Sequence, residues 1–285
     1  MPLISILDEL KKAQREHYAI PCFDTFELMG TQGIFAALEA KRAPAIIGLY
    51  SGLFDRPNAG AVIAMVRALA QDATVPVSLI IDHGADFEHC MQALRYGYTD
   101  IMYDGSKLPL EENIANTRMV VRAAHAVGAA VEAELGHVGR GHEYQSFGAL
   151  GKGFTDPATV EKFVAETGVD FLAVAVGTAH GSYQGEPNLA LDLLEEIRRR
   201  VEIPLVLHGG SGLSDAQYRA AIERGICKIN IFTNLALAAG ARMKEEAQAE
   251  DASYFSMIRA IPDAFQEACE RFIDVFGEHV LPQFD

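Results

Sequence analysis

The sequence lacks the features that mark secreted and disulfide-rich proteins. It has only four cysteines, Cys22, Cys90, Cys227 and Cys269, which lie far apart and form no CxxC pair. The N-terminus also lacks the basic and then apolar pattern of a signal peptide. Unpaired cysteines without an export signal fit a reducing compartment. We therefore expect a cytoplasmic protein.

Positive charge and long apolar runs are scarce as well. The chain has 24 Lys and Arg against 39 Asp and Glu, so its net charge is −15, and a surface of this charge repels nucleic acids and anionic membranes. The densest basic run, Arg198 to Arg200, is typical of a solvated helix C-terminus. Apolar runs such as Val75 to Ile81 are much shorter than the roughly 18 residues that a membrane span needs. We expect neither a nucleic-acid nor a membrane partner.

Short apolar runs alternate with longer amphipathic stretches along the whole chain. This alternation is typical of βαβ units and a parallel sheet. The 285 residues suit one α/β barrel, which needs roughly 250. We therefore predict a single (β/α)₈ TIM barrel domain over residues 1–285. Its eight strands are predicted at Tyr18–Phe23, Pro44–Leu49, Val77–Ile81, Asp100–Tyr103, Ala130–Glu134, Phe171–Val176, Pro204–Leu207 and Cys227–Ile231.

Helix start signals support this strand count. Pro109 precedes two glutamates, Asp156 precedes Pro157 and Ser214 precedes Asp215, and each combination is typical of a helix N-terminus. Two segments depart from a minimal barrel. The glycine-rich segment 136–155, after the fifth strand, is predicted to be an irregular, mobile lid. The segment after about Asp251 is predicted to form one or two extra helices that cap the barrel or contact another subunit.

Polar residues stand where the predicted strands end, which is where a barrel of this kind places its chemistry. Any one histidine is more often structural than a ligand. Three of them on one rim beside carboxylates instead indicate a site for a borderline metal such as Zn²⁺, with a coordination position left for substrate. The residues concerned are Asp24, Asp82, His83, Asp104, Glu134, His180, His208 and Asn230.

The segments after the sixth and seventh strands are rich in glycine around two of these histidines. Glycines there expose backbone N–H groups, and such loops followed by a helix N-terminus bind phosphate. Asn230 and Thr233 after the eighth strand would complete the cradle. The alternative is that the glycines only make tight turns. The loops read Gly177-Thr178-Ala179-His180-Gly181 and His208-Gly209-Gly210-Ser211-Gly212.

As an ordered set, these motifs resemble the class II fructose-bisphosphate and tagatose-bisphosphate aldolases over essentially the whole chain. The resemblance implies that His83, His180 and His208 bind zinc, with Co²⁺ or Mn²⁺ as alternatives, and that Asp82 is the acid/base at the C4 hydroxyl. It implies that Glu134 is an occasional metal contact and that Asp104 lies near a second metal or a monovalent cation. Phosphate contacts would come from Gly181, Gly209, Gly210, Ser211 and residues 230–233. The motifs are Asp82-His83-Gly84, Asp104-Gly105-Ser106, Val131 to Gly136, the two glycine-rich loops and Lys228-Ile229-Asn230.

The chemistry that the resemblance implies explains these residue types. Cleavage of the C3–C4 bond of a ketose phosphate releases dihydroxyacetone phosphate and an aldehyde and leaves a carbanion at C3. A divalent ion that coordinates the C2 and C3 oxygens stabilises this carbanion as an enediolate. No Schiff-base lysine is then needed, and the neighbours of Lys228 give no sign of a second cation that would lower its pKa.

The sequence departs from the family pattern in four places. The loop after Gly139 reads Arg140, Gly141, His142, Glu143 instead of carrying adjacent glutamates, so either Glu143 or His142 moves the C3 proton, or the step differs. Gln184 stands where a lysine is usual, Phe232 where a small or polar residue is usual, and Asp24 where an asparagine is usual. Gln184 removes a positive charge and Asp24 adds a negative one, so both are expected to weaken phosphate binding. We therefore hypothesise another ketose 1-phosphate, or a ketose with a non-phosphate group, as substrate.

Two other functions stay open at this stage. A sugar epimerase would use the same metal and retro-aldol step but recombine the fragments. A non-catalytic sugar-phosphate binding protein would account for the missing loop glutamates, although it has no need of Asp82. The resemblance also implies a homodimer or homotetramer.

Overall fold

Eight parallel strands close into a barrel in the computed structural model, which describes residues 3–277; residues 1–2 and 278–285 of the predicted domain lie outside this range. The barrel order is β1-β10-β9-β7-β5-β4-β3-β2. All eight predicted strands are present, which confirms the predicted (β/α)₈ fold. Their bounds are β1 Ile20–Asp24, β2 Ala45–Tyr50, β3 Val77–Gly84, β4 Asp100–Tyr103, β5 Ala130–Leu135, β7 Phe171–Val174, β9 Leu205–Leu207 and β10 Ile226–Ile231.

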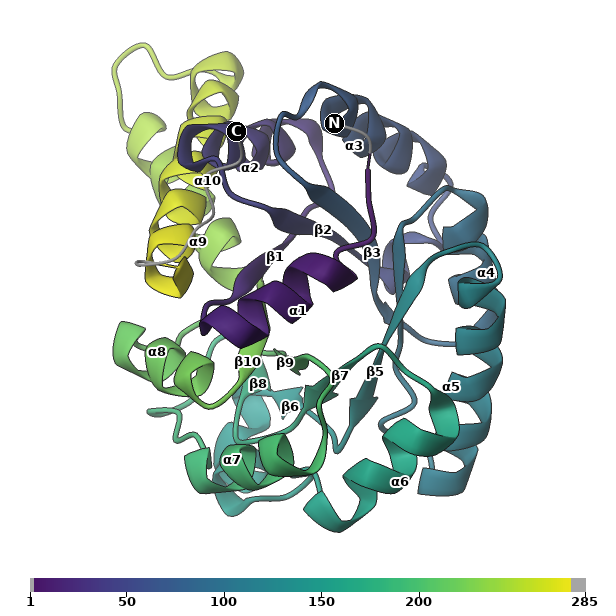
Figure 1. The fold of residues 1–285 in the computed structure, drawn as a ribbon. Helices are drawn as coiled ribbons and strands as arrows, with labels where there is room; N and C mark the ends of the chain where they lie inside the picture. Colours follow the sequence, from purple (N-terminus) through teal and green to yellow (C-terminus); the bar gives the residue numbers. More distant parts are fainter. Residues whose placement is uncertain (1–2, 278–285) are drawn as a thin grey trace.

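Helices surround the barrel (Figure 1). Three begin at the predicted signals: α5 after Pro109, α6 with Asp156 as its N-cap and α8 with a Ser214–Gln217 capping box. None of the helices within residues 3–277 is long and apolar enough to cross a membrane. The helices are α1 Leu7–Glu16, α2 Leu28–Lys41, α3 Ala59–Asp72, α4 Phe87–Arg95, α5 Leu110–His125, α6 Pro157–Thr167, α7 Leu191–Arg200, α8 Asp215–Glu223, α9 Thr233–Glu246 and α10 Tyr254–Gly277, with a short 3₁₀ helix η1 at Ser51–Leu53.

Helix α1 closes the amino-terminal end of the barrel. Figure 1 shows it lying across the ring of strands. Its buried Leu10 and Ala13 join the side chains that fill the barrel interior, among them Ile46 and Phe171. The Asp100 carboxylate anchors the segment before α1, because it accepts hydrogen bonds from Ser5 Oγ and from the Ile6 backbone N–H at 2.5 and 2.9 Å. The barrel interior is therefore filled with side chains at this end.

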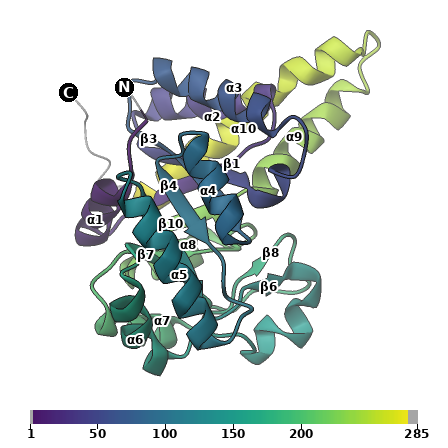
Figure 2. The same cartoon turned by 90° about the vertical axis from the view of Figure 1, so that its right-hand side faces the viewer.

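The segment after β5 is more ordered than the sequence suggested. It contains the short strand β6 Gly139–Arg140 and the 3₁₀ helices η2 Gly141–Ser146 and η3 Gly148–Leu150. Strand β6 pairs in parallel with β8 Ala179–His180, so the prediction of an irregular segment was wrong. The cross-strand hydrogen bonds are the physical reason, because they fix both segments against each other. Figure 2 shows β6 and β8 at the end of the barrel opposite α1. The predicted mobility of this lid stays a prediction.

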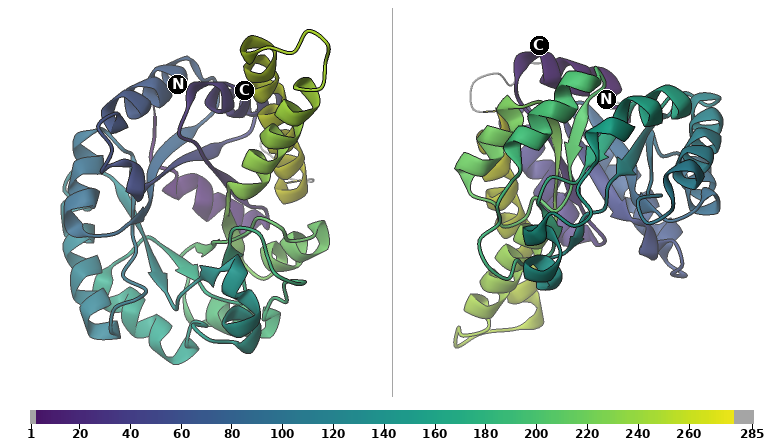
Figure 3. Two further views of the ribbon diagram at one scale, coloured as in Figure 1. Left: turned by 180° about the vertical axis from the view of Figure 1, so that it is seen from behind. Right: turned by 90° about the horizontal axis from the view of Figure 1, so that it is seen from below.

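The C-terminal segment forms a single long helix within the described residues. α10 packs along α2 and α9, and buried Phe265, Phe272 and Phe276 join the main core. The prediction of one or two further helices is therefore confirmed as one. Figure 3 shows that the hairpin of α9 and α10 extends past the ring of barrel helices. The predicted homo-oligomer stays a prediction.

The contact between α2 and α10 depends on a glycine. A Cβ placed on Gly33 would lie 2.3 Å from the carbonyl oxygen of Pro262 and 2.7 Å from Phe265 Cβ. Real Cβ atoms do not approach this closely, so α10 would have to move outward. By contrast, a Cβ on Gly240 in α9 would meet nothing within 4 Å apart from its own helix and chain neighbours.

We therefore expect Gly33→Ala to destabilise the protein by about 1–3 kcal/mol through overpacking. The matched variant Gly240→Ala should be neutral or stabilising by up to ~1 kcal/mol, because alanine is the better helix former. Thermal unfolding of both variants measures this difference. Equal melting temperatures for the two would show that the α2–α10 contact does not require a glycine.

Candidate active site and metal centre

A cavity of about 1000 Å³ opens at the carboxyl ends of the barrel strands. Most of the residues predicted from the sequence line it, although they are widely separated along the chain. Those that line it are Asp24, Asp82, His83, Asp104, Glu143, His180, Gly181, His208, Gly209, Ser211, Asn230, Phe232 and Thr233. Glu134, His142, Gln184 and Gly210 do not belong to the lining.

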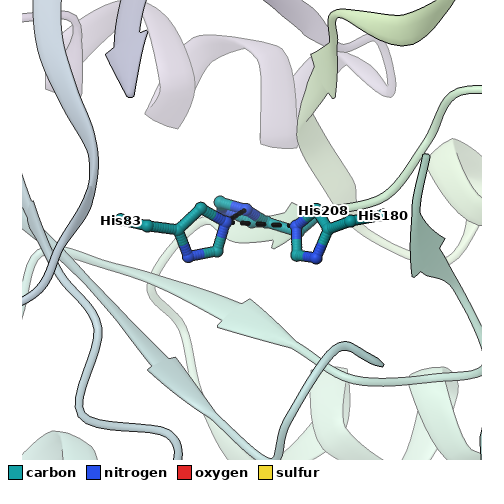
Figure 4. A group of neighbouring side chains, drawn as sticks. All are labelled: His83, His180 and His208. Atoms are coloured by element: carbon teal, nitrogen blue, oxygen red, sulfur yellow. Dashed lines mark hydrogen bonds between the residues drawn. The ribbon is translucent and has the colours of Figure 1, made fainter. Parts of the chain in front are cut away.

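Three imidazoles converge at the floor of this cavity. His83 Nε2 lies 3.1 Å from His180 Nε2 and 3.1 Å from His208 Nδ1. One nitrogen from each ring faces the same point, as the side chains in Figure 4 show. The three ligand atoms lie within 4.8 Å of one another. The histidines come from β3, from β8 and from the position directly after β9, so the tertiary fold brings them together.

Carboxylates orient two of the three rings. His83 Nδ1 is 2.7 Å from Asp104 Oδ2, and His208 Nε2 is 2.6 Å from Glu132 Oε1. His83 also has a left-handed backbone with φ of 52°, which is uncommon outside glycine. Such a conformation persists where surrounding contacts impose it, typically at functional sites. Here the carboxylate fixes the ring and the pairing of β3 with β4 shifts beside it.

Burial and neighbouring charges set the protonation of these rings. Burial lowers the pKa of His180 to about 3, and the nearby His83 and His208 contribute to the shift. Burial also lowers the pKa of His208 well below its ordinary value. Burial alone would lower the pKa of His83, but Asp82, Asp104 and Glu134 raise it to about 10. Two rings are therefore neutral, and carboxylates favour a positive charge at the third.

This donor set fits a divalent metal ion. Metal-binding histidines use a neutral nitrogen and commonly have the other nitrogen held by a carboxylate. Three such ligands with an open position are typical of catalytic zinc sites. Asp104 and Glu134 form a second group with His83. Glu134 Oε2 is buried without a hydrogen-bond partner, and burial with Asp104 nearby raises the pKa of Glu134 to about 8.

Two aspartates, Asp24 and Asp82, line the wall of the cavity. Asp82 Oδ1 accepts a hydrogen bond from Asn230 Nδ2 at 2.8 Å. Asp24 is 9% exposed, and its Oδ1 atom is buried without a hydrogen-bond partner. Burial raises the pKa of Asp24 well above its ordinary value, and the charge of Asp82 adds to the shift. Asp24 therefore holds a proton far more readily than an ordinary aspartate does.

The glycine-rich loops form an open concavity beside the histidines. Gly181 has φ of 85° and has open space where a Cβ would lie. A Cβ on Gly209, at φ of 66°, would clash with the Ala179 backbone 2.6 Å away. The N-terminus of α9 lies at Thr233 and has no side-chain cap. Free N–H groups at a helix N-terminus attract anions. Gly210 instead packs behind the cradle, where its carbonyl accepts a hydrogen bond from Tyr218.

Glu143 and His142, the two lid residues considered for the C3 proton transfer, lie in different surroundings. Glu143 lines the cavity, whereas the side chain of His142 is 62% exposed and lies outside it. Gln184 is exposed, and its backbone carbonyl accepts a hydrogen bond from Gln145 Nε2 at 2.7 Å. Strand β6 pairs Arg140 with His180. The lid that carries Glu143 is therefore attached directly to a strand that carries one of the histidines.

Two charged residues beneath the site were not predicted from the sequence to be site residues. Glu132 and Lys228 are buried inside the barrel and form an ion pair at 2.9 Å. Burial alone would lower the pKa of Lys228, but the Glu132 carboxylate raises it, so the amine is not poised for Schiff-base chemistry. A charged residue within an apolar strand needs a partner in the interior. The sequence therefore contained a signal for this pair, because Glu132 in β5 and Lys228 in β10 each interrupt an apolar run.

The opening of the cavity carries aromatic and basic side chains. Phe26 and Phe232 stack edge to face with ring centroids 5.8 Å apart, and they are 47% and 36% exposed. The exposed Arg56, Lys107 and Arg140 line the same cavity. Because exposed charges are common on any surface, the sequence offered no signal that set these three apart.

The comparison with known proteins agrees with this site. Residues 4–279 match the fructose-bisphosphate aldolase class-II family. The chain is 41% identical to a probable fructose-bisphosphate aldolase of Bacillus subtilis over 89% of its length and 90% of that protein. It is 39% identical to the D-tagatose-1,6-bisphosphate aldolase subunit GatY of Klebsiella oxytoca, over 84% of each chain. The crystal structure of the YdjI aldolase from Escherichia coli K12 superimposes with a TM-score of 0.86 at 35% identity, over 96% of this chain and 97% of that one. This chain therefore belongs to the class II fructose-bisphosphate aldolase family, and it is an aldolase, a carbon–carbon lyase.

Proposed function

We propose that this aldolase reversibly cleaves a ketose 1-phosphate into dihydroxyacetone phosphate and an aldehyde, with one zinc-type ion bound by His83, His180 and His208. The observation that carries the proposal is the convergence of three imidazole nitrogens, a hydrogen-bonded Asp82 and an anion cradle in one cavity. Each part serves one atom group of such a substrate. The family and the relatives support the reaction class.

The residues divide the reaction between them. When bound, the ion supplies Lewis-acid polarisation of the substrate oxygens and so stabilises the charge that develops at C3. Asp82 accepts the proton of the C4 hydroxyl as the C3–C4 bond breaks, and C4 leaves as the aldehyde. The bond electrons remain on C3, to which the Glu143 carboxyl then donates a proton. The cradle at Gly181, Gly209, Ser211 and residues 230–233 binds the C1 phosphate.

The metal assignment predicts that the protein binds about one zinc-type ion per chain and that chelation abolishes cleavage. His180→Ala should lose both the ion and the activity, because a three-ligand site is left with two. The control is His125→Ala, since His125 pairs with Asp170 on the surface. Metal analysis and triose release measure the two effects. An His180→Ala protein that keeps full metal content would contradict the assignment.

The position of the lid predicts a difference between its neighbouring residues. Glu143→Gln should lower kcat for cleavage by roughly 10²-fold, because the C3 carbon loses its proton donor. His142→Gln should remain within about threefold of the wild type, since His142 lies outside the cavity. Steady-state kinetics of the two variants compare them. A larger loss for His142→Gln would reverse the assignment of the C3 proton transfer.

The remaining question is which chemical group the substrate carries at its distal end, the end that becomes the aldehyde. Burial beside Asp82 favours a protonated Asp24 carboxyl, which offers a distal phosphate no positive charge, and Gln184 in the segment after β8 is neutral where the family pattern has a lysine, so a second phosphate is disfavoured. The aromatic pair Phe26 and Phe232 suits the C–H face of a longer sugar. We propose a ketose 1-phosphate without a distal phosphate. The second candidate is a ketose with a distal anion, favoured by the exposed Arg56 and Lys107 at the opening.

A panel of ketose 1-phosphates that differ at the distal end separates these candidates. We expect higher kcat/KM for at least one ketose with an uncharged end than for fructose 1,6-bisphosphate. Triose release should be measured for each substrate at equal metal content. If fructose 1,6-bisphosphate is turned over as well as or better than every other ketose, the substrate proposal fails and the distal-anion candidate stands.

The same panel addresses the remaining alternatives. An epimerase would return a stereoisomer of the ketose without free triose. A non-catalytic binding protein would cleave no ketose at any metal content. The assembly as a homodimer or homotetramer stays a prediction, which sedimentation of the purified protein would decide.

A further inference from the structure

A chain of buried polar contacts runs beneath the site from a metal-binding histidine to the acid/base. His208 Nε2 lies 2.6 Å from Glu132 Oε1, and Glu132 Oε2 lies 2.9 Å from Lys228 Nζ. Lys228 Nζ donates to Asn230 Oδ1 at 2.6 Å, and Asn230 Nδ2 donates to Asp82 Oδ1 at 2.8 Å. Glu132, His208 and Lys228 are all 0% exposed. Lys228 occupies the centre of this chain.

Lys228 fixes the direction of the last two hydrogen bonds. An ammonium group has three donors and no acceptor, whereas an amide side chain offers an acceptor at one end and a donor at the other. The amide oxygen of Asn230 must therefore face Lys228, and its NH₂ group must face Asp82. A reversed amide would set NH₂ against the ammonium and an oxygen against the carboxylate. Both contacts would be repulsive inside the barrel, where unpaired polar groups are costly.

This arrangement leaves one side of Asp82 free for substrate. Within residues 3–277, the Asp82 carboxylate accepts one side-chain hydrogen bond. Its donor is Asn230, and the accepting atom is Oδ1. Asp82 is 7% exposed and lines the cavity. Because Asn230 holds Oδ1, the other carboxylate oxygen has no side-chain hydrogen bond among the described residues to compete with a substrate hydroxyl in the cavity. Proton transfer is sensitive to such orientation, because a misplacement of about 1 Å costs roughly 10²-fold in rate.

We propose that Lys228 is a positioning residue, which orients the Asn230 amide so that Asp82 is held for proton transfer at the C4 hydroxyl. This inference rests on the proposed function, because it assigns Asp82 to that hydroxyl. Lys228 itself is separated from the substrate by Asn230 and does not take part in covalent chemistry. Its ion pair with Glu132 keeps the ammonium charged within the barrel and completes the link to His208.

The test uses the full-length metal-loaded protein with the double variant Glu132→Gln/Lys228→Met. The single variant Lys228→Met leaves a buried carboxylate without its partner and risks unfolding. In the double variant, the new glutamine still offers an oxygen to His208, while the methionine cannot donate to Asn230. Thermal unfolding and metal content of the double variant serve as controls for folding and for the histidine site.

Two reactions are compared in wild type and variant. The first is ketose cleavage, which needs Asp82, and the second is exchange of the C3 hydrogen of dihydroxyacetone phosphate with deuterated solvent, which involves no C4 hydroxyl. We expect kcat for cleavage to fall by ~10²-fold or more with KM within about threefold, because orientation of the acid/base is lost. Exchange should fall by less than about tenfold, since the phosphate cradle and metal site remain.

The outcomes are distinct. A double variant that cleaves within about threefold of the wild type overturns the positioning role and leaves the proposed function intact. A parallel loss of cleavage and exchange, with loss of metal, shows that Lys228 only supports the structure and also overturns the inference. If the wild-type protein cleaves no ketose in the panel, the proposed function fails first and the role of Lys228 fails with it.

Discussion

The pairing of β1 with β10 is the constraint on which the site depends. These strands come from opposite ends of the chain, and their register places Cys22 beside Asn230 and Phe23 beside Ile231. Through this pairing the sheet closes, and the carboxyl ends of all eight strands meet at one rim. Without closure, Asp24 on the first strand and the Asn230 to Thr233 segment after the last would not share a cavity. The parallel direction of every strand ensures that these polar ends point the same way.

The barrel interior carries charge as well as apolar packing. Most of its side chains are aliphatic or aromatic, yet Glu132 and Lys228 lie among them with no exposed surface. Burying two charges costs several kcal/mol before their attraction is counted, so a buried ion pair is weak evidence for stability. The pair lies directly beneath the histidines and between His208 and Asn230. Its position explains its presence better than stability does, because it fixes polar groups that must not rotate.

Above the pair, the balance of charge differs between the two halves of the cavity. His83 lies among the carboxylates of Asp82, Asp104 and Glu134, which favour positive charge there. The cradle offers backbone N–H groups and a helix N-terminus and so favours an anion. In the proposed function, a metal ion and a phosphate would therefore occupy separate places. Asp24 and Phe232 at the wall of the cavity are two of the positions at which this chain departs from the family pattern, and in the proposed function this wall faces the end of the substrate that differs among ketoses.

Local patterns in the sequence determined the fold class and the identity of the principal site residues. Short apolar runs and helix start signals depend on neighbouring residues alone, which is why all eight strands could be placed. Polar residues at strand ends followed from the same reasoning, and a parallel barrel brings such residues to one rim whatever the loops do. The lid was less predictable, since the strand pairing between Gly139 and Ala179 joins two segments that give only weak local signals.

Only the tertiary structure decided which of these residues act together. It placed Glu143 in the cavity and His142 outside it, although the two are adjacent in sequence. It also joined Glu132, Lys228 and Asn230 into one chain of contacts, which depends on side-chain distances across the barrel. The protonation of Asp24 depends on burial beside Asp82, a property of the environment and not of the residue type. Sequence by itself determined which chemical groups reach the rim, whereas distances, burial and hydrogen-bond direction arose only when the barrel closed.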